Sequence, residues 1–288
     1  MRIGEFRNDQ ARARFTAAYE RALAQLWPGG HTALDLPTSY GTTRAYLCGP
    51  ARGGPIVLLP GSGGNSLMWH RYLAELSREH RVIAVDTVGE PGASVQRAPI
   101  ADGRAGAAWL DELLTALDVT GAHLVGCSYG GWLALSHQLH HPGPRVAGLT
   151  LVEPAGLAPL DRRFYGWVVA GGLAALAPRA LRPRLARLVG NSAILETELM
   201  TLMRASTGFR RALPVPSALT DEELSGLPVP VQVLLGERSA LHDSPAVAAR
   251  LAAHCPAART ELVPGAGHAL PTDAPALVTA RILAAVRA

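Results

Sequence analysis

A serine between two glycines, in Gly126-Cys127-Ser128-Tyr129-Gly130, follows a mostly apolar run and precedes a helical pattern. This order of strand, Gly-x-Ser-x-Gly and helix is typical of a nucleophile elbow, a tight turn that exposes its central side chain. The glycines are expected because a Cβ at either position would meet the backbone as the chain doubles back. We therefore predict that Ser128 is a nucleophile and that the helix after it directs its positive end toward the charge that forms there.

A second reactive side chain, His268, closes the glycine-rich stretch Pro264-Gly265-Ala266-Gly267. The stretch follows the strand expected at 259–263, so the imidazole lies in a flexible loop at the end of that strand. An imidazole there can reach a serine hydroxyl and accept its proton. Of the ten histidines in the chain, we predict that His268 is the general base.

The elements that position these two residues alternate along the chain. Apolar runs typical of buried strands are separated by helical patterns, which predicts an α/β fold with a mostly parallel, doubly wound sheet. Strands are expected at 32–36, 42–48, 55–59, 81–86, 122–127, 146–152, 229–236 and 259–263, and helices at about 8–27, 66–79, 104–117, 244–253 and 272–286. A further helix directly after the elbow is expected from the pattern of Trp132, Leu133, Leu135 and Leu139.

The alternation breaks between residues 157 and 219, where the chain is rich in Ala, Leu and Arg. Helices are predicted there at 161–176, 179–189 and 193–202. We predict a helical cap at 157–219, inserted into a core formed by 1–156 and 220–288 that includes the N-terminal helix. The arginines of the cap are interpreted as a solvated face, with an anionic substrate as the alternative partner for some of them. The apolar stripe at 167–176 is interpreted as cap core rather than a membrane contact, and the lining of an acyl pocket stays open as an alternative.

Composition limits the possible functions of the 288-residue chain. Hydrophobic residues make up 48% and charged residues 17%, which favours a large folded core. The formal charge of +4 is spread along the chain, without the basic stripe that nucleic-acid binding needs. The three cysteines lie far apart and predict neither a disulfide framework nor a zinc site. The N-terminus lacks an apolar signal core and no run is long enough to span a bilayer, so we expect a cytoplasmic protein that does not use a membrane.

Four stretches together resemble the α/β-hydrolase superfamily over nearly the whole chain. More narrowly, the sequence is similar to bacterial carboxylesterases with an N-terminal helix and a helical cap. The stretches that carry the resemblance are Leu58-Leu59-Pro60-Gly61-Ser62-Gly63-Gly64, Val85-Asp86-Thr87-Val88-Gly89, Leu124 to Trp132 around the serine, and Val263 to His268.

The resemblance implies an oxyanion hole and a set of residues around the substrate. In this fold the loop after the strand at 55–59 supplies one backbone N–H and the residue after the nucleophile supplies the other, here Ser62 and Tyr129. Substrate contacts are expected from four further residues, Gly61, Gly63, Trp132 and Trp167.

The acid that orients the histidine is not at its usual place. The family has it at the third position after the glycine that ends the strand at 229–236, and that position is Ser239. Glu153, at the end of the strand after the elbow strand, and Asp243, four residues beyond Ser239, are the candidates. We favour Glu153 over Asp243. Glu237 is expected to point away from the site because strand side chains alternate.

The resemblance thus implies hydrolysis of a small-molecule ester through an acyl-enzyme, with no metal or organic cofactor. Two other interpretations stay open from the sequence. One is a specialised enzyme of the same fold in natural-product biosynthesis, such as a thioesterase, a C–C hydrolase or a cyclase. The other is a catalytically weak protein that binds a ligand in the same pocket.

Overall fold

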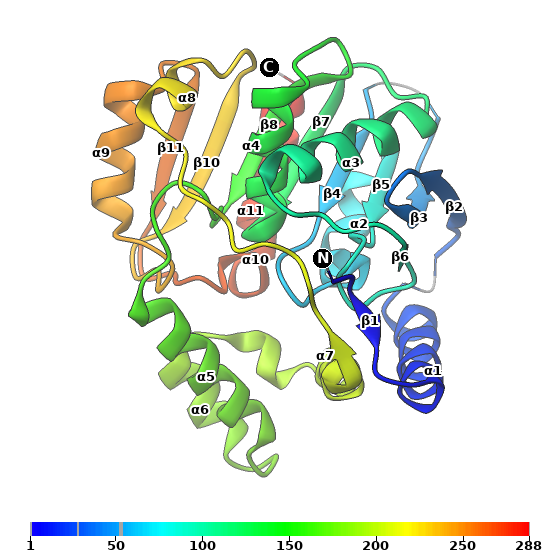
Figure 1. Ribbon diagram of the computed structural model, residues 1–288. Helices are drawn as coiled ribbons and strands as arrows, with labels where there is room; N and C mark the ends of the chain where they lie inside the picture. The colour runs from blue at the N-terminus through cyan, green and yellow to red at the C-terminus, as the bar shows by residue number, and fades with distance from the viewer. Residues whose placement is uncertain (1, 28, 52–53, 288) are drawn as a thin grey trace.

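The computed structural model describes residues 2–27, 29–51 and 54–287 (Figure 1). Residues 1, 28, 52, 53 and 288 belong to the predicted core and lie outside the described residues. A twisted sheet occupies the upper part of the view and has helices on both faces, while a further group of helices lies below it.

The main sheet has the spatial order β2-β3-β5-β4-β7-β8-β10-β11. The pairs β2–β3 and β3–β5 are antiparallel, and the pairs from β5 to β11 are parallel. The prediction of a mostly parallel, doubly wound sheet is therefore confirmed. The strands are β1 (Glu5–Phe6), β2 (Thr32–Thr38), β3 (Gly41–Cys48), β4 (Ile56–Leu59), β5 (Val82–Val85), β6 (Val95–Gln96), β7 (Ala122–Cys127), β8 (Val146–Val152), β9 (Phe209–Arg210), β10 (Val231–Gly236) and β11 (Ala258–Val263).

Helices cover the sheet in two layers, each with its own apolar cluster. Side chains of α3, α4 and α9 pack on one face, and those of α2 and α11 pack on the other. The helices are α1 (Asp9–Leu26), α2 (His70–Leu76), α3 (Gly103–Ala116), α4 (Tyr129–His140), α5 (Arg162–Leu176), α6 (Arg182–Val189), α7 (Thr197–Ala205), α8 (Asp221–Ser225), α9 (Ser244–His254), α10 (Leu270–Asp273) and α11 (Pro275–Val286).

The strand β4 shows why continuous apolar runs mark the centre of the sheet. Val57 and Leu59 enter the cluster on the α3–α4 face, while Ile56 and Leu58 enter the opposite one. Because successive side chains point to opposite faces, a strand covered on both sides must be apolar at every position. The parallel strands then end at one edge of the sheet, where ligands of open α/β sheets bind.

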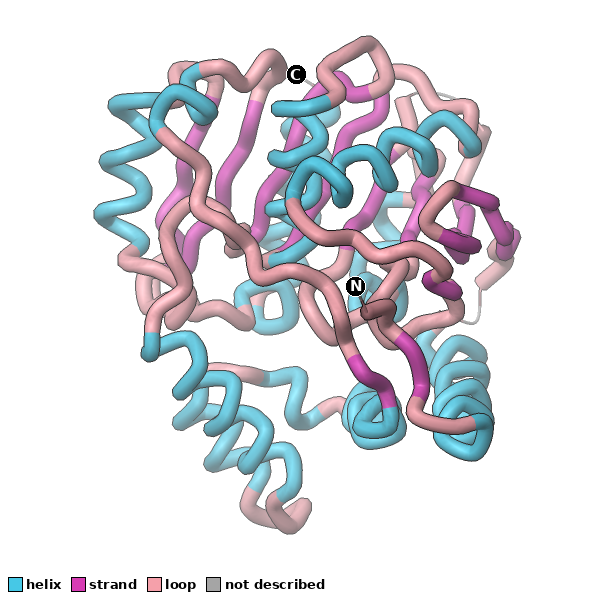
Figure 2. Tube along the Cα trace, in the orientation of Figure 1, coloured by secondary structure: helices cyan, strands magenta, loops and turns pink. Residues whose placement is uncertain are grey.

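An insert between β8 and β10, comprising α5, α6, α7 and β9, lies beyond that edge of the sheet (Figure 1). The N-terminus joins it, because β1 pairs with β9 in antiparallel register, and the two strands lie next to each other near α7 and α1 in Figure 2. Phe15 of α1 and Leu202 of α7 belong to the same apolar cluster. The sequence predicted neither β1 nor β9, since a two-residue strand has no periodicity to recognise.

The interpretation of the stripe at 167–176 as cap core is wrong for most of its side chains. Only Ala174 and Ala175 are buried within it, while Val169, Leu173 and Leu176 are exposed. Apolar character predicted burial, but a helix at the surface of an insert has solvent on one side. None of the helices in the described part of the chain combines the length and the apolar character needed to cross a membrane.

Candidate active site

Ser128 lies at a turn between β7 and α4 with φ 47° and ψ −111°. Few residues other than glycine adopt positive φ, and such strain persists where the surrounding structure enforces it. The flanking glycines make the turn possible. A Cβ on Gly126 would lie 2.6 Å from the Gly130 carbonyl oxygen, and one on Gly130 would lie 2.3 Å from the Leu59 carbonyl oxygen. The predicted reason for both glycines is confirmed.

His268 and Glu153 form a buried pair that joins residues 115 positions apart. The Nδ1 atom of His268 lies 3.0 Å from Oε2 of Glu153. Glu153 directly follows β8, is fully buried and has φ 51°. The backbone N–H of Gly236 and the hydroxyl of Ser239 also donate to its carboxylate. A buried carboxylate with three donors is held firmly in one orientation.

Ser239 helps to hold the acid at the end of β8. Its hydroxyl donates a hydrogen bond to the Glu153 carboxylate, at the position where the resemblance led us to expect an acid. Asp243 does not reach His268. It is exposed and caps α9 by accepting a hydrogen bond from the backbone N–H of Ala246 at 3.2 Å. Glu237 is exposed as well and accepts from the backbone of the loop before His268.

The pairing fixes which nitrogen of His268 carries hydrogen. An ionised carboxylate only accepts hydrogen bonds, so Nδ1 donates and Nε2 keeps a free lone pair. Two aromatic rings of α5 hold the imidazole from the side of the insert. The ring centroids of Phe164 and Trp167 lie 5.4 and 5.2 Å from that of His268, nearly perpendicular to it. Trp167 is itself fixed, because its indole N–H donates to the Val189 carbonyl at 2.8 Å.

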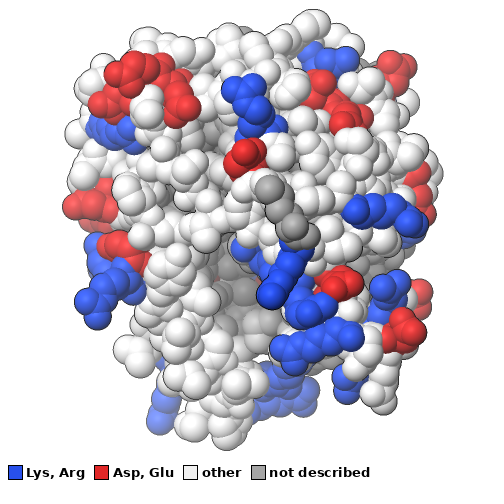
Figure 3. All heavy atoms as spheres, in the orientation of Figure 1, with Lys and Arg blue, Asp and Glu red and all other residues white. Residues whose placement is uncertain are grey.

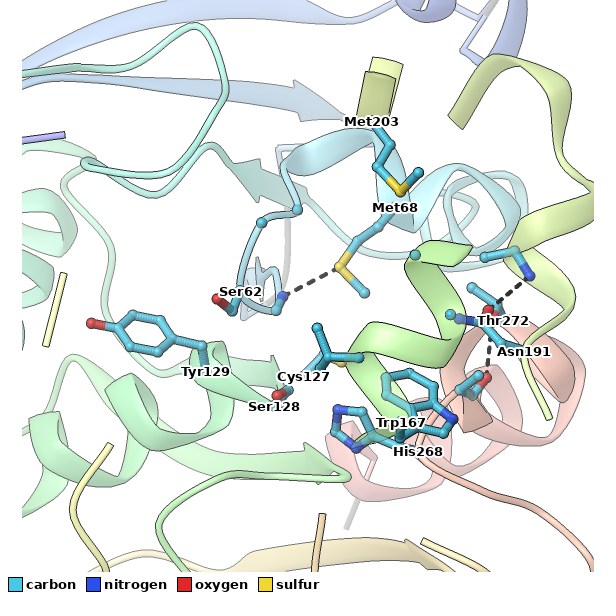
Figure 4. Close-up of a pocket in the computed structure, with 18 of the residues that line it drawn as sticks. Ser62, Met68, Cys127, Ser128, Tyr129, Trp167, Asn191, Met203, His268 and Thr272 are labelled. Atoms are coloured by element: carbon cyan, nitrogen blue, oxygen red, sulfur yellow. Dashed lines mark hydrogen bonds between the residues drawn. The ribbon is translucent and has the colours of Figure 1, made fainter. Parts of the chain in front are cut away.

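Ser128 and His268 line one cavity of about 690 Å³. In Figure 4 the side chains of Ser128 and His268 lie in the same part of the cavity wall, with Trp167 next to the imidazole. In the described structure no hydrogen bond joins the Ser128 hydroxyl to the His268 imidazole. Catalytic hydrogen bonds are often long without substrate and shorten when it binds.

In the loop after β4 the backbone N–H of Ser62, which lines this cavity, is free. The three glycines of the loop have their N–H groups engaged, and only Ser62 between them has none of the described atoms as a partner. The acceptors are Met68 Sδ for Gly61, Glu90 Oε2 for Gly63 and the Gly61 carbonyl for Gly64. Tyr129, as the first residue of α4, has a second free N–H, because the first donors of a helix lack partners within it. Ser62 and Tyr129, which carry these two N–H groups, line the same cavity as Ser128.

An ion pair between a buried acid and a partly exposed arginine supports this loop. Glu90 is 2% exposed and accepts from the Gly63 N–H, while Nε of Arg211 donates to its other oxygen at 2.6 Å. The Arg211 guanidinium also lies 4.8 Å from the centroid of the Tyr129 ring. Burial raises the pKa of the Glu90 carboxyl, and the charge of Arg211 opposes that shift. The sequence missed both residues, since nothing distinguishes Glu90 from other loop acids and Arg211 is 121 positions away.

Replacing Arg211 with leucine is expected to lower the free energy of unfolding by about 1–3 kcal/mol, because Glu90 then stays buried without its cation. Arg210 offers a matched control, since its ion pair with Glu5 is exposed on both sides. Arg210→Leu should change stability by less than about 1 kcal/mol. Urea unfolding monitored by tryptophan fluorescence measures both variants. Equal losses of unfolding free energy in the two variants would contradict a supporting role for the Glu90–Arg211 pair.

The other predicted contact residues divide into two groups. Gly61, Gly63 and Trp167 line the cavity, as do Ser62 and Tyr129. Trp132 does not, and its prediction as a substrate contact is corrected. One turn along α4 from the elbow, its buried ring packs behind the site, where Cβ atoms on Gly103 and Gly156 would lie 3.2 and 2.7 Å from it.

Burial shifts the pKa of two further ionisable side chains near the pair. It raises the pKa of the Cys127 thiol to about 12, with the Glu153 charge adding to the shift. A thiol with that pKa is neither nucleophile nor metal ligand at neutral pH. Burial also lowers the pKa of His242, and the charge of Glu153 opposes that shift.

Comparison with known proteins places this geometry in a family. Residues 56–281 match the model of the alpha/beta hydrolase family. The chain belongs to that family. The matched segment spans the loop of Ser62, the elbow, Glu153 and His268, so the whole constellation of this alpha/beta hydrolase lies within it.

Relatives and solved structures cover nearly the full length of this hydrolase. It is similar to carboxylesterase YbfK of Bacillus subtilis, 29% identical over 94% of this chain and 92% of the relative. The uncharacterized carboxylesterase nap of the same organism is 27% identical, over 94% and 91%. The crystal structure of naproxen esterase from Bacillus subtilis superposes with a TM-score of 0.83 at 27% identity, over 95% of this chain and 97% of that one.

Proposed function

We propose that the protein is a serine hydrolase that cleaves a carboxylic ester of a small-molecule substrate through an acyl-enzyme. One observation carries the proposal: the buried Glu153–His268 pair lies in the same cavity as Ser128, which a strained turn exposes. The relatives named carboxylesterases support an ester as the bond cleaved. The alternative of a ligand-binding protein is disfavoured, because strain of this kind is typical of functional sites.

In the proposed mechanism the Ser128 hydroxyl attacks the ester carbonyl while Nε2 of His268 accepts its proton. The N–H groups of Ser62 and Tyr129 donate to the oxyanion of the tetrahedral intermediate. The imidazolium then gives its proton to the departing alcohol, which leaves an acyl-serine. His268 next takes a proton from water, the hydroxide attacks the acyl group, and the proton returns to Ser128.

Glu153 contributes by its charge and its fixed position. Its carboxylate keeps the Nδ1 hydrogen in place, so Nε2 faces the nucleophile, and it stabilises the imidazolium that forms during each proton transfer. The same carboxylate is held by Gly236 and Ser239, so little reorganisation is needed when the charge develops.

The substrate is proposed to lie between the sheet and the insert. We propose the division into a core of 1–156 and 220–288 and a cap of 157–219, in which α5 forms the roof. Aromatic and aliphatic side chains dominate the cavity above Ser128, and its volume suits an ester with a sizeable apolar group. An apolar cavity of this kind would select substrates by the shape of their apolar group, while the polar groups of the site contact the reacting carbonyl.

A panel of activated substrates tests the proposal. We expect the purified protein to hydrolyse p-nitrophenyl esters from acetate to octanoate faster, by kcat/KM, than matched thioesters, and to leave β-diketones intact. Faster cleavage of the thioester or of the C–C bond would favour the specialised enzymes of the same fold. Absence of turnover on every substrate, with saturable binding of the esters, would favour a ligand-binding protein.

A further inference from the structure

Helix α5 has two apolar faces, and only one of them is used by the cavity. The side chains that line the cavity recur at helical spacing, at Phe164, Val168, Gly171 and Ala175. A second row repeats at the same spacing and is open to solvent, with exposed fractions of 51% for Tyr165, 62% for Val169, 66% for Leu173 and 68% for Leu176. Tyr165 lies at the edge between the two rows and also lines the cavity. A helix that is apolar on both sides needs a second apolar environment.

The exposed face continues into the next helix. Leu181, just before α6, is 47% exposed, and Leu188 near the end of α6 is 82% exposed. Helices α5 and α6 pack together through Ala174 and Ala186, which fixes the two exposed rows relative to each other. Single apolar side chains on a surface are ordinary, whereas several on two helices that pack together are typical of an interaction site.

Positive charge surrounds these apolar side chains. Residues 161–190 contain six arginines and a single acid, Asp161, which caps α5. None of these arginines forms an ion pair with any described residue, and all except Arg182 are exposed. In Figure 3 the lower left of the molecule, where α5 and α6 lie in Figure 1, is largely white with blue side chains at its lower edge. The arginines are Arg162, Arg163, Arg179, Arg182, Arg184 and Arg187.

We propose that this α5–α6 surface, formed by the six exposed apolar side chains and the exposed arginines, docks on an anionic lipid bilayer. Apolar side chains on one face of a basic helix enter the boundary between headgroups and acyl chains. Each arginine near the surface adds attraction to anionic headgroups. A second copy of the chain fits less well, because a symmetric contact would bring two sets of unpaired arginines together.

Docking in this orientation links the membrane to the cavity. Both rows belong to α5, so a lipophilic molecule leaving the bilayer would meet the helix that roofs the cavity. Of the six apolar docking residues only Tyr165 also lines the cavity, whereas Val169, Leu173, Leu176 and Leu188 do not. Binding to lipid is therefore a property separate from hydrolysis, and it is measured without any substrate.

Vesicle flotation tests the proposal with the full chain. The vesicles contain ether-linked phosphatidylcholine, either alone or with 40% ether-linked phosphatidylglycerol, so the lipids offer no ester bond. We expect the protein to float with the anionic vesicles at least tenfold more than with the neutral ones, and to be released by 0.5 M NaCl because salt screens the attraction. No binding, or equal binding to both vesicles, would overturn the proposal.

Two variants separate the apolar and the charged contributions. Leu173→Glu/Leu176→Glu should abolish flotation, and Arg184→Gln/Arg187→Gln should weaken it about 10- to 30-fold, from about 1 kcal/mol for each arginine. Arg78→Gln/Arg104→Gln removes the same charge from exposed sites outside α5 and α6, in the turn after α2 and on α3, and should leave flotation unchanged. All three should hydrolyse a soluble ester like the wild type. Loss of flotation in the charge control would contradict docking on lipid. So would normal flotation of Leu173→Glu/Leu176→Glu, if the wild type is a dimer and this variant is a monomer.

Discussion

Replacing Ser128 with alanine is expected to lower kcat for ester hydrolysis by about 10⁶, the scale measured when a triad loses its nucleophile. The physical reason is that no acyl-enzyme can form, and only the oxyanion donors and substrate binding remain. The elbow itself should survive, since alanine occupies no more space than serine at this turn. Steady-state kinetics with a p-nitrophenyl ester measures the loss, and circular dichroism checks the fold.

Ser136 provides the matched control for this substitution. It is a buried serine two turns further along α4 and does not line the cavity. Ser136→Ala should keep kcat within about twofold of the wild type. If Ser128→Ala retained substantial activity while folded, another residue would have to be the nucleophile, and the role assigned to the elbow would be wrong.

Replacing Glu153 with glutamine is expected to lower kcat by about 10² to 10⁴, the range associated with loss of the orienting acid. Glutamine keeps the shape of the side chain but lacks the charge that stabilises imidazolium. Its amide can also present a donor to Nδ1, which would favour the wrong tautomer of His268. The measurement is kcat at pH 7 with a saturating soluble ester.

Asp243→Asn is the control for the second carboxylate candidate. Asparagine caps a helix as well as aspartate does, so α9 should remain intact. Because Asp243 is exposed and bonded to the helix that it caps, its variant should keep wild-type kcat. A large loss for Asp243→Asn together with a mild effect of Glu153→Gln would reverse the assignment of the acid.

The sequence was sufficient for the features that depend on local spacing. The elbow around Ser128 and the loop before His268 each consist of a strand, glycines at fixed offsets and one reactive side chain, so their geometry is determined within a few residues. The mostly parallel sheet was equally accessible, because its central strands must be apolar at every position when both faces are covered.

Long-range packing explains what the sequence could not decide. Whether Glu153 or Asp243 meets His268 depends on how the end of β8 lies against the loop after β11, and the structure places Glu153 there. The ion pair between Glu90 and Arg211 joins segments with no common pattern. The prediction of Trp132 as a substrate contact failed for a related reason, since its ring packs beside Gly103 and Gly156, which are distant in sequence.

The α5–α6 surface shows the limit of hydropathy as a guide to burial. The apolar stripe was expected to form the core of the cap, yet Leu173 and Leu176 remain largely exposed. The periodicity of α5 fits two apolar faces, and nothing in the sequence reveals that only one of them is covered by the rest of the chain.

Covalent trapping tests the central claim most directly. A fluorophosphonate probe reacts with a serine only when a neighbouring base activates it. We expect the probe to label the wild-type protein within minutes, and peptide mass spectrometry to locate the adduct on Ser128. His268→Ala should slow the labelling at least 10³-fold. Labelling at a different serine, or labelling of Ser128 at the same rate without the imidazole, would contradict a nucleophile activated by His268.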